Sequence, residues 1–216
     1  MLFQTLDSKH ECVGIYADDK LFFDQELFPS SLTQTWSYTP IQRDAEVASL
    51  YLEGTDINEI VPEYLKDDWE DVLHSLDSFR RYLKLSQVSR AENCFYDLVP
   101  DRFLMDYCQV KNKITSYVLQ NVKRPSRYEF YAQVAHLLHK IRGQKLVLDK
   151  RKVASHSDPL VTKIFSAPPY IRYRQFGTKT GRLTTHPESF PILTLKKEMR
   201  SFIRPTNDLF VEIDFN

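Results

Sequence analysis

A long amphipathic stretch from Pro62 to Leu85 constrains the fold of this chain more than any other feature. Its apolar residues recur every three or four positions, the period of an α-helix with one buried face. They are Val61, Leu65, Trp69, Val72, Leu73, Leu76, Phe79 and Leu83. Acidic residues occupy the opposite face, and basic residues occupy the last turns, as the helix dipole favours. We expect a structural helix whose acidic face avoids nucleic acid.

Two further stretches predict helices. One follows Pro100 and ends near Asn121, with an apolar stripe that begins at Phe103. The other runs from about Ser126 to Arg142, and Gly143 is placed to end it. Five glycines in 216 residues are few for a mainly β protein. The coarse pattern is therefore mostly helical.

The first 60 residues predict a smaller, mixed region. Strands at Glu11–Tyr16 and Leu21–Phe23 flank a turn at Asp18 and Asp19, and a short helix is expected near residues 44–52. Asp7, Asp18, Asp19 and Asp24 invite comparison with a metal-dependent exonuclease, but no D-x-E opening stands on the first strand. We interpret these carboxylates as turn and loop residues and expect no exonuclease.

Charge is segregated along the chain although its net value is zero. Residues 1–110 carry 9 Lys and Arg residues against 21 Asp and Glu residues, and residues 111–152 carry 11 against 2. Such a local positive excess is typical of an element that contacts phosphates. The alternative, a solvated helical face, more often mixes both signs.

The cysteine and hydropathy patterns indicate the cellular compartment of the protein. Cys12, Cys94 and Cys108 are far apart and match no zinc or disulfide framework, and His136 and His139 have no third ligand in sight. No secretory leader or membrane-spanning run stands in the sequence. We expect an intracellular, cytoplasmic protein without a membrane partner.

The end of the chain, Thr178–Asn216, carries the chemistry. Leu209–Ile213 is a short apolar run that predicts a mostly buried strand, and Asp214 stands where that strand stops. A carboxylate on a rigid strand end is a good metal ligand. A Gly181-Arg182 pair lies upstream in a Thr-rich turn, and a basic cluster lies between. That cluster comprises Lys196, Lys197, Arg200 and Arg204. Together these features indicate phosphoryl chemistry on a nucleic acid.

This stretch resembles the palm of a family A (polymerase I-like) DNA polymerase. The family carries a T-G-R-L-[ST]-[ST] segment, a basic run and then motif A, which begins D-Y-S. The matching segments here are Thr180-Gly181-Arg182-Leu183-Thr184-Thr185, Arg200-Ser201-Phe202-Ile203 and Asp214-Phe215-Asn216, in that order. The resemblance is tight over about forty residues and only general upstream. It departs at Phe215 and Asn216, where the family often has Tyr and Ser, and at His186–Pro191, which replaces a segment rich in Asn and Gln.

The resemblance implies a role for each matching residue. Asp214 would bridge two Mg²⁺ ions, with the backbone carbonyl of Phe215 as a companion ligand. Arg182 would reach the minor groove near the primer terminus, and Arg200 would contact the primer backbone. The expected DNA-binding residues are Arg182, Arg200, Gly181, Thr180, Thr184, Lys111, Lys113, Lys140, Arg142 and Lys145. Thr185, Arg172 and Arg174 are further candidates, and Lys150-Arg151-Lys152 is either the same surface or an ordinary basic linker.

The expected fold is α+β, with a mainly helical thumb-like hairpin and a partial antiparallel palm sheet. The helices that end near residues 121 and 142 would form that hairpin, and residues 170–176 would form a palm strand. Residues 1–60 would be the N-terminal region, 61–155 the thumb-like region and 156–216 the partial palm.

The implied function is template-directed addition of deoxynucleotides to a primer 3′-hydroxyl. The family's ribose-gating Glu, its fingers Lys and its second catalytic Asp would lie beyond Asn216. We therefore expect an inactive part of a polymerase, completed by a second polypeptide or by further chain. Its partners would be primer–template DNA and a deoxynucleoside triphosphate, and a phage-encoded member would act in the host cytoplasm. Two alternatives remain: a DNA clamp without catalysis that uses residues 111–152, and a metal-dependent nuclease that uses Glu212 with Asp214.

Overall fold

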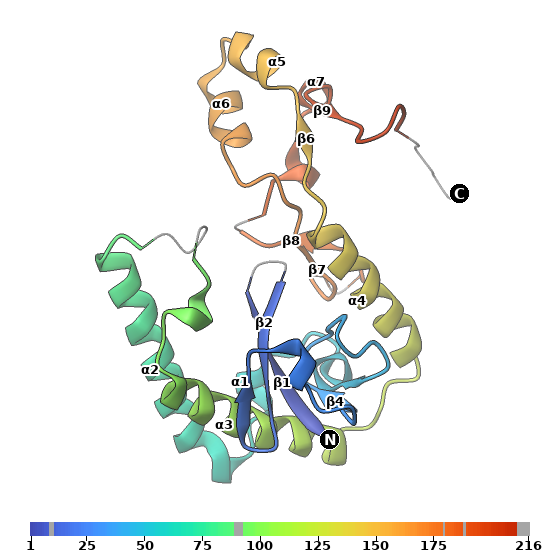
Figure 1. Cartoon of the computed structure of the whole chain (residues 1–216). Coiled ribbons are helices and arrows are strands. Elements are labelled where there is room, and N and C mark those ends of the chain that lie inside the picture. The colour runs from blue at the N-terminus through green and yellow to red at the C-terminus, as the bar shows by residue number, and fades with distance from the viewer. Residues whose placement is uncertain (9–10, 89–92, 179, 188, 211–216) are drawn as a thin grey trace. The chain divides into compact units, whose positions relative to one another are not determined.

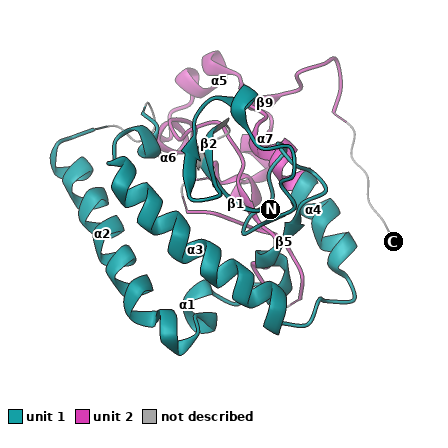
Figure 2. Cartoon of the chain, turned by 60° about the horizontal axis from the view of Figure 1, so that its bottom comes forward, with its two compact units in different colours: residues 1–136 teal, residues 137–216 magenta. Residues whose placement is uncertain are grey.

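The computed structural model describes residues 1–8, 11–88, 93–178, 180–187 and 189–210. The fold is mixed α+β and 47% helical, with one five-stranded mixed sheet and two small two-stranded sheets. The chain divides into two units, residues 1–136 and 137–216, each of which is described by itself (Figure 2). The boundary between them falls inside the region 61–155 that the sequence predicts as thumb-like.

Unit 1 contains the five-stranded sheet (Figure 1). Its strands are β1 (Leu2–Ser8), β2 (Glu11–Ala17), β3 (Lys20–Phe22), β4 (Gln34–Thr35) and β5 (Glu46–Val47), in the spatial order β3-β2-β1-β4-β5. The first three strands are antiparallel, whereas β4 pairs parallel with β1 and β5 pairs parallel with β4. The short helices of this unit are η1 (Gln25–Leu27), η2 (Ala48–Leu52), α1 (Ile57–Ile60), η3 (Glu63–Leu65) and η4 (Phe95–Asp97).

The predicted hairpin is confirmed, and one strand beside it was not expected. Asp18 and Asp19 both have positive φ, 50° and 55°, the combination that a two-residue hairpin turn of type I′ requires. The unexpected strand β1 lacks the usual alternation because Gln4 is buried among apolar neighbours. Its amide Nε2 donates hydrogen bonds to Asn112 Oδ1 and Thr115 Oγ1, both at 2.9 Å. A buried amide satisfied by a distant helix leaves no local signal in the sequence.

Helices α2 (Lys66–Leu85) and α3 (Asp101–Asn121) pack side by side, as Figure 2 shows. The predicted helix over residues 62–85 is confirmed, and its first turn is the 3₁₀ helix η3. One apolar cluster joins the two helices: Val61, Leu65, Trp69, Val72, Val110 and Ile114. A second joins α3 to the sheet: Leu6, Tyr16, Val99, Phe103, Leu104 and Cys108. Helix α3 is therefore the centre of unit 1, and α2 covers one of its sides.

Helix α4 (Tyr128–Arg142) is confirmed as a helix, but its core stripe is not buried as expected. Tyr128 is its one buried residue among those described, and its hydroxyl accepts a hydrogen bond of 2.7 Å from the Val47 N–H. The expected interior positions Val134 and Leu138 are only half-buried. The boundary between the two units lies within this helix, after His136. Gly143 follows the last turn without a positive φ.

Unit 2 consists of short elements around one apolar cluster. They are β6 (Val147–Leu148), α5 (Lys150–Ser155), α6 (Pro159–Phe165), β7 (Tyr173–Arg174), β8 (Thr184–Thr185), η5 (Ile192–Thr194), α7 (Lys197–Arg200) and β9 (Ile203–Arg204). The cluster comprises Val161, Phe165, Phe190, Leu195, Met199 and Phe202. The palm strand expected over 170–176 is limited to β7. Its pairing continues through single bonds from His186 N–H to Arg172 O at 2.9 Å and from Phe190 N–H to Tyr170 O at 3.0 Å.

The strand expected at Leu209–Ile213 is not seen in its described part. Leu209 and Phe210 are 78% and 66% exposed and belong to no strand, while residues 211–213 lie outside the described residues. An apolar run forms a buried strand only if it can pair with a neighbouring strand and pack against a core. The described part of the chain provides neither beside Leu209 and Phe210. Across the described ranges, no helix combines the length and the apolar character needed to cross a bilayer.

Candidate nucleic-acid interface

The Thr-Gly-Arg segment occupies the loop between β7 and β8 in unit 2. These strands pair antiparallel, Tyr173 with Thr185 and Arg174 with Thr184. The Thr178 side chain closes the loop: its Oγ1 accepts a hydrogen bond of 2.9 Å from the Arg182 N–H and donates one of 3.1 Å to the Arg182 carbonyl. The Thr178 hydroxyl closes the loop together with a backbone hydrogen bond of 3.2 Å from the Gly181 N–H to the Thr178 carbonyl. Thr178 was not among the predicted site residues; its position four residues before Arg182 is the sequence signal that could have identified it.

Two glycines shape this loop for different reasons. Gly181 has φ +77°, a conformation that disfavours side chains, and among the described residues no atom beyond its chain neighbours lies within 4 Å of the position a Cβ would take. Its backbone is therefore open to a ligand. Gly177 is needed for packing instead, because a Cβ there would lie 1.9 Å from Thr184 Oγ1. Thr184 consequently packs against the loop, which leaves Thr180 and Gly181 as its exposed polar surface.

Three arginines of this hairpin differ in their surroundings. Arg182 is exposed, and its guanidinium makes no ion pair with any described residue. Arg174 Nε lies 3.3 Å from His186 Nδ1 across the hairpin. Arg172 is half-buried, and its backbone N–H donates to Ser189 Oγ at 2.9 Å. Arg182 is therefore the arginine of this loop that is most available to a phosphate or a base edge.

Among the described residues, one of the four cations at residues 196–204 is paired with a carboxylate. Lys196, Lys197 and Arg200 are exposed on and beside α7. Arg204 instead pairs with Asp149, which is 8% exposed: Arg204 Nε donates at 2.9 Å, and Nη2 makes a second, short contact. Arg204 thus stabilises the fold and is not a free phosphate ligand.

Asp149 also caps helix α5, since its Oδ1 accepts hydrogen bonds of 3.2 Å from the Arg151 and Lys152 N–H groups. The Arg204 guanidinium and these backbone donors hold the pKa of this carboxyl below its ordinary value of 3.8.

We expect unit 2 to lose stability in acid because of this carboxyl. A lowered folded-state pKa means that Asp149 stabilises unit 2 above the pKa of the unfolded chain, and that this contribution disappears as pH falls through the folded pKa. Urea unfolding of unit 2 between about pH 2 and pH 6 should therefore show a falling midpoint on acidification. Asp149→Asn should have a lower midpoint near neutral pH and a flatter acid limb. Glu198→Gln, an exposed position on α7, should retain the acid limb of the wild type; an equal flattening in both variants would contradict this role.

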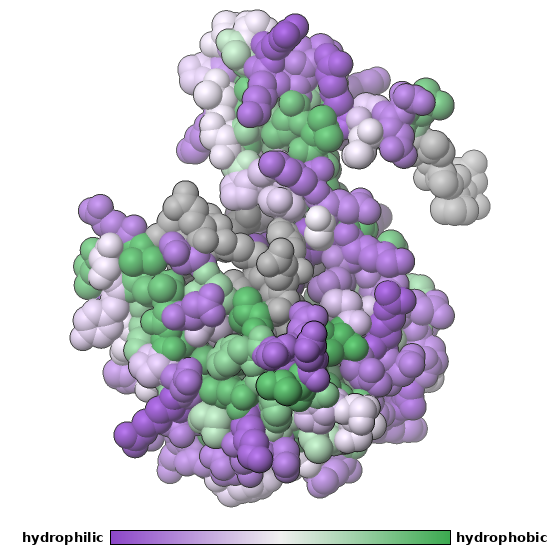
Figure 3. Space-filling model, in the orientation of Figure 1, coloured by the Kyte–Doolittle hydropathy of each residue, from purple (hydrophilic) through white to green (hydrophobic). Residues whose placement is uncertain are grey.

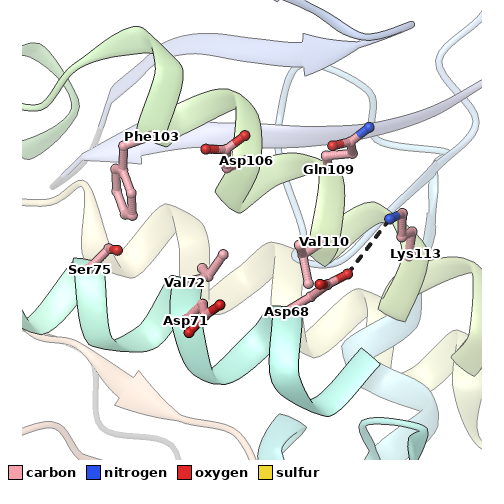
Figure 4. A pocket seen from close by; sticks show the side chains of 9 residues that line it. All are labelled: Asp68, Asp71, Val72, Ser75, Phe103, Asp106, Gln109, Val110 and Lys113. Atoms are coloured by element: carbon pink, nitrogen blue, oxygen red, sulfur yellow. Dashed lines mark ion pairs between the residues drawn. The ribbon is translucent and has the colours of Figure 1, made fainter. Parts of the chain in front are cut away.

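The two predicted DNA-binding lysines on α3, in unit 1, each lie close to another side chain. Lys111 Nζ lies 5.3 Å from the centroid of the Tyr107 ring, and Lys113 Nζ lies 3.9 Å from Asp68 Oδ2. A hollow of about 280 Å³ lies between α2 and α3. Figure 4 shows Lys113 at one end of it, facing Asp68, with Asp71 and Asp106 farther along the two helices. The lining residues are Asp68, Asp71, Val72, Ser75, Phe103, Asp106, Gln109, Val110 and Lys113. A phosphate at Lys113 would face several carboxylates, which is electrostatically unfavourable.

The other predicted contacts of the basic segment belong to unit 2. Lys140 and Lys145 are exposed, and Arg142 is half-buried. The structure thus brings Thr180, Gly181, Arg182 and Thr184 together on one hairpin. It assigns Lys111 and Lys113 to the other unit.

The predicted metal ligands Asp214 and Phe215 lie outside the described residues, as does Glu212. Among the described residues no group of three or more His, Cys, Asp or Glu side chains could hold a metal ion. His136 contacts Tyr38 instead: Nδ1 meets the tyrosine hydroxyl in a short hydrogen bond, and the rings are T-shaped at 5.6 Å.

The acidic residues near the N-terminus have structural partners. Asp19 Oδ1 accepts a hydrogen bond of 2.7 Å from the Tyr16 hydroxyl, and burial together with this bond raises the tyrosine pKa. Asp24 caps η1 by accepting from the Glu26 N–H at 3.0 Å. The interpretation as turn and loop residues is confirmed for Asp18, Asp19 and Asp24, but it is wrong for Asp7, which lies in strand β1 opposite Cys12.

Unit 2 therefore presents a hydrogen-bonded Gly-Arg turn and a set of exposed cations near α7. No protein-family model, curated protein or solved structure matches this chain.

Proposed function

We propose that this chain is part of a family A DNA-directed DNA polymerase. The observation that carries the proposal is the order of three matching segments along the chain: the Thr180–Thr185 loop, the Arg200 segment and the Asp214-Phe215-Asn216 end. The loop geometry supports it, because Gly181 is unobstructed and Arg182 is exposed beside it. The reaction is template-directed addition of a deoxynucleotide to a primer 3′-hydroxyl.

Arg182 would contact the minor groove of the duplex near the primer terminus. All base pairs present N3 or O2 acceptors there, so a long planar donor can test the shape of a pair without reading its sequence. The Thr178 side chain fixes the Arg182 backbone on both sides, which limits the positions that the guanidinium can reach. A restrained donor loses less entropy on binding than a mobile one.

The metal site would be formed around Asp214. Carboxylate and carbonyl oxygens are the ligands that Mg²⁺ prefers, and Asp214 with the Phe215 carbonyl offers both kinds. Two bound Mg²⁺ ions supply activation of the primer hydroxyl and neutralisation of the pyrophosphate leaving group. A second bridging carboxylate and a nucleotide-binding segment are also needed. We propose that a second polypeptide, or chain beyond Asn216, provides them.

The finer architecture belongs to the same proposal. The helices that end near residues 121 and 142, α3 and α4, would correspond to the helical hairpin of the thumb. The antiparallel pairs β7–β8 and β6–β9 of unit 2 would belong to a partial palm. Primer–template DNA and a deoxynucleoside triphosphate are the ligands of the completed enzyme.

Substitution of Arg182 tests the proposed role of the loop. Arg182→Ala removes charged hydrogen bonds to the minor groove, each worth about 1.5–3 kcal/mol, so primer–template affinity should fall roughly 10- to 100-fold. The loss should be similar for all sequences near the primer terminus, since the contacted acceptors are common to all base pairs. Fluorescence anisotropy with labelled primer–templates of different terminal sequence measures both the affinity and its dependence on sequence.

Arg81→Ala on α2 is the matched control, because it removes an exposed arginine from the acidic helix. Its affinity should equal that of the wild type. An unchanged affinity of Arg182→Ala would contradict the proposed minor-groove contact.

A further inference from the structure

Two basic runs that lie about fifty residues apart in the sequence are neighbours in unit 2. Strand β6 pairs antiparallel with β9, Val147 opposite Arg204 and Leu148 opposite Ile203. The Asp149 N–H continues this pairing with a bond of 2.8 Å to the Phe202 carbonyl. Helix α5 therefore begins directly beside the segment that follows α7. Lys152 Nζ confirms the contact, since it donates to the Ser201 carbonyl at 3.3 Å.

This pairing gathers six exposed cations, which we call the α5–α7 basic patch. They are Lys150, Arg151, Lys152, Lys196, Lys197 and Arg200. The acidic residues within residues 149–152 and 196–204 are Asp149 and Glu198. Asp149 is 8% exposed and already pairs with Arg204, so only Glu198 offsets the patch from these two segments. The space-filling view shows hydrophilic residues over the part of unit 2 that carries α5 (Figure 3).

The chemistry of the patch suits the backbone of a duplex better than a single strand. Proteins that bind single strands combine positive charge with exposed aromatic side chains on which bases stack. Phe202, the aromatic residue of the two segments, is 8% exposed and is covered by Phe165 and His156, with ring centroids 5.4 and 5.6 Å away. The patch therefore offers charge without a stacking platform, which is the character of sequence-independent phosphate contacts.

We propose that the α5–α7 basic patch binds the phosphate backbone of duplex DNA, as a second contact surface separate from the Thr-Gly-Arg loop. The choice of DNA as the duplex rests on the proposed function, whereas the phosphate chemistry follows from the patch itself. The patch holds the duplex by charge alone. Its contribution is independent of sequence and strongly dependent on salt.

The test removes two cations that have no described structural role. Lys150→Ala/Arg151→Ala leaves the Asp149 cap intact, because that cap uses backbone N–H groups. Each lost phosphate contact should lower affinity for duplex DNA by about eightfold at 0.1 M salt, so the double variant should bind roughly 60-fold more weakly. The slope of log affinity against log salt should become shallower by about 1.8. Anisotropy of a blunt-ended labelled duplex, titrated with the full chain at several salt concentrations, measures both.

The matched control is Arg81→Ala/Lys84→Ala, which removes the same two charges from exposed positions at the end of α2 in unit 1. It should bind as the wild type does. Equal weakening in the two double variants would overturn the proposal, since it would show a general charge effect. An unchanged affinity and salt slope in Lys150→Ala/Arg151→Ala, with folding confirmed by circular dichroism, would also overturn it.

Further arms separate this proposal from its rivals and from the proposed function. Tighter binding to single-stranded DNA, to duplex RNA or to vesicles of anionic lipid than to duplex DNA at equal salt would overturn the assignment to duplex DNA. Arg182→Ala should retain blunt-duplex binding through the patch and lose affinity at a primer terminus. Arg182→Ala could bind primer–template DNA as tightly as the wild type while Lys150→Ala/Arg151→Ala binds duplex DNA more weakly. That result would contradict the proposed role of the Thr-Gly-Arg loop and would support the proposal for the α5–α7 basic patch.

Discussion

Asp214→Ala should lower template-directed primer extension by about 10³-fold, because a carboxylate that bridges two metal ions has no substitute among its neighbours. The measurement compares the wild-type and substituted chains, each with the polypeptide or further chain that completes it, on a labelled primer–template with Mg²⁺. DNA affinity should change little, since the proposed DNA contacts lie at Arg182 and in the α5–α7 basic patch. The substitution separates catalysis from binding.

Asp208→Ala is the control for this experiment, since Asp208 is an exposed carboxylate six residues upstream. It should extend primers as the wild type does. Undiminished extension by Asp214→Ala would contradict the catalytic role and favour a DNA clamp without catalysis. Mg²⁺-dependent cleavage of labelled DNA that requires both Glu212 and Asp214 would favour the nuclease.

Phe190→Ala should lower the free energy of unfolding of unit 2 by about 3–5 kcal/mol, the usual cost of truncating a fully buried Phe. Phe190 is 0% exposed, its ring meets the Phe165 ring edge-on at 5.5 Å, and its backbone N–H pairs with Tyr170. The truncation removes the centre of the apolar cluster that supports both the hairpin and the basic patch. Hydrogen exchange should accelerate at unit 2 amides such as Leu146 and remain slow at Ile114 in unit 1.

The matched control is Leu193→Ala, three residues away and 52% exposed, which should change stability by less than about 0.5 kcal/mol. Equal losses at Phe190 and Leu193 would contradict the assignment of the core. Equal acceleration of exchange in both units would show that they unfold together.

The long helices could be predicted because their signal is local. The periodic apolar residues of α2 and α3 specify a buried face over many turns, and no distant partner is needed to recognise it. The turn at Asp18 and Asp19 was equally local. Strand β1 was missed because its buried Gln4 is satisfied only by Asn112 and Thr115 on α3. Such long-range compensation is invisible to a pattern read along the chain.

The candidate site was predictable in its residue types and less so in their surroundings. The Gly181-Arg182 pair was recognised from its neighbours in sequence, and the structure gives it a loop held by Thr178. Arg204 and Arg200 looked alike in sequence. Only the pairing of β6 with β9 brings Asp149 to Arg204 and leaves Arg200 exposed.

Long-range packing also explains why the surroundings of the basic runs could not be predicted from the sequence. Lys113 lies opposite Asp68 through the packing of two helices, and Lys150–Lys152 lies beside the segment after α7 through strand pairing. Counting charges along the sequence detects neither of these two arrangements. A positive segment can therefore contain neutralised residues, and a linker-like run can become part of a patch.

The most direct test of the central claim is the composition of the native protein. Intact-mass measurement of the protein purified from its source, together with everything that co-purifies, shows what accompanies these residues. The proposal predicts either a 25.5 kDa chain held by a second polypeptide or a larger single chain, with template-directed primer extension in both cases. A solitary 25.5 kDa chain that binds duplex DNA and extends no primer would contradict the polymerase assignment.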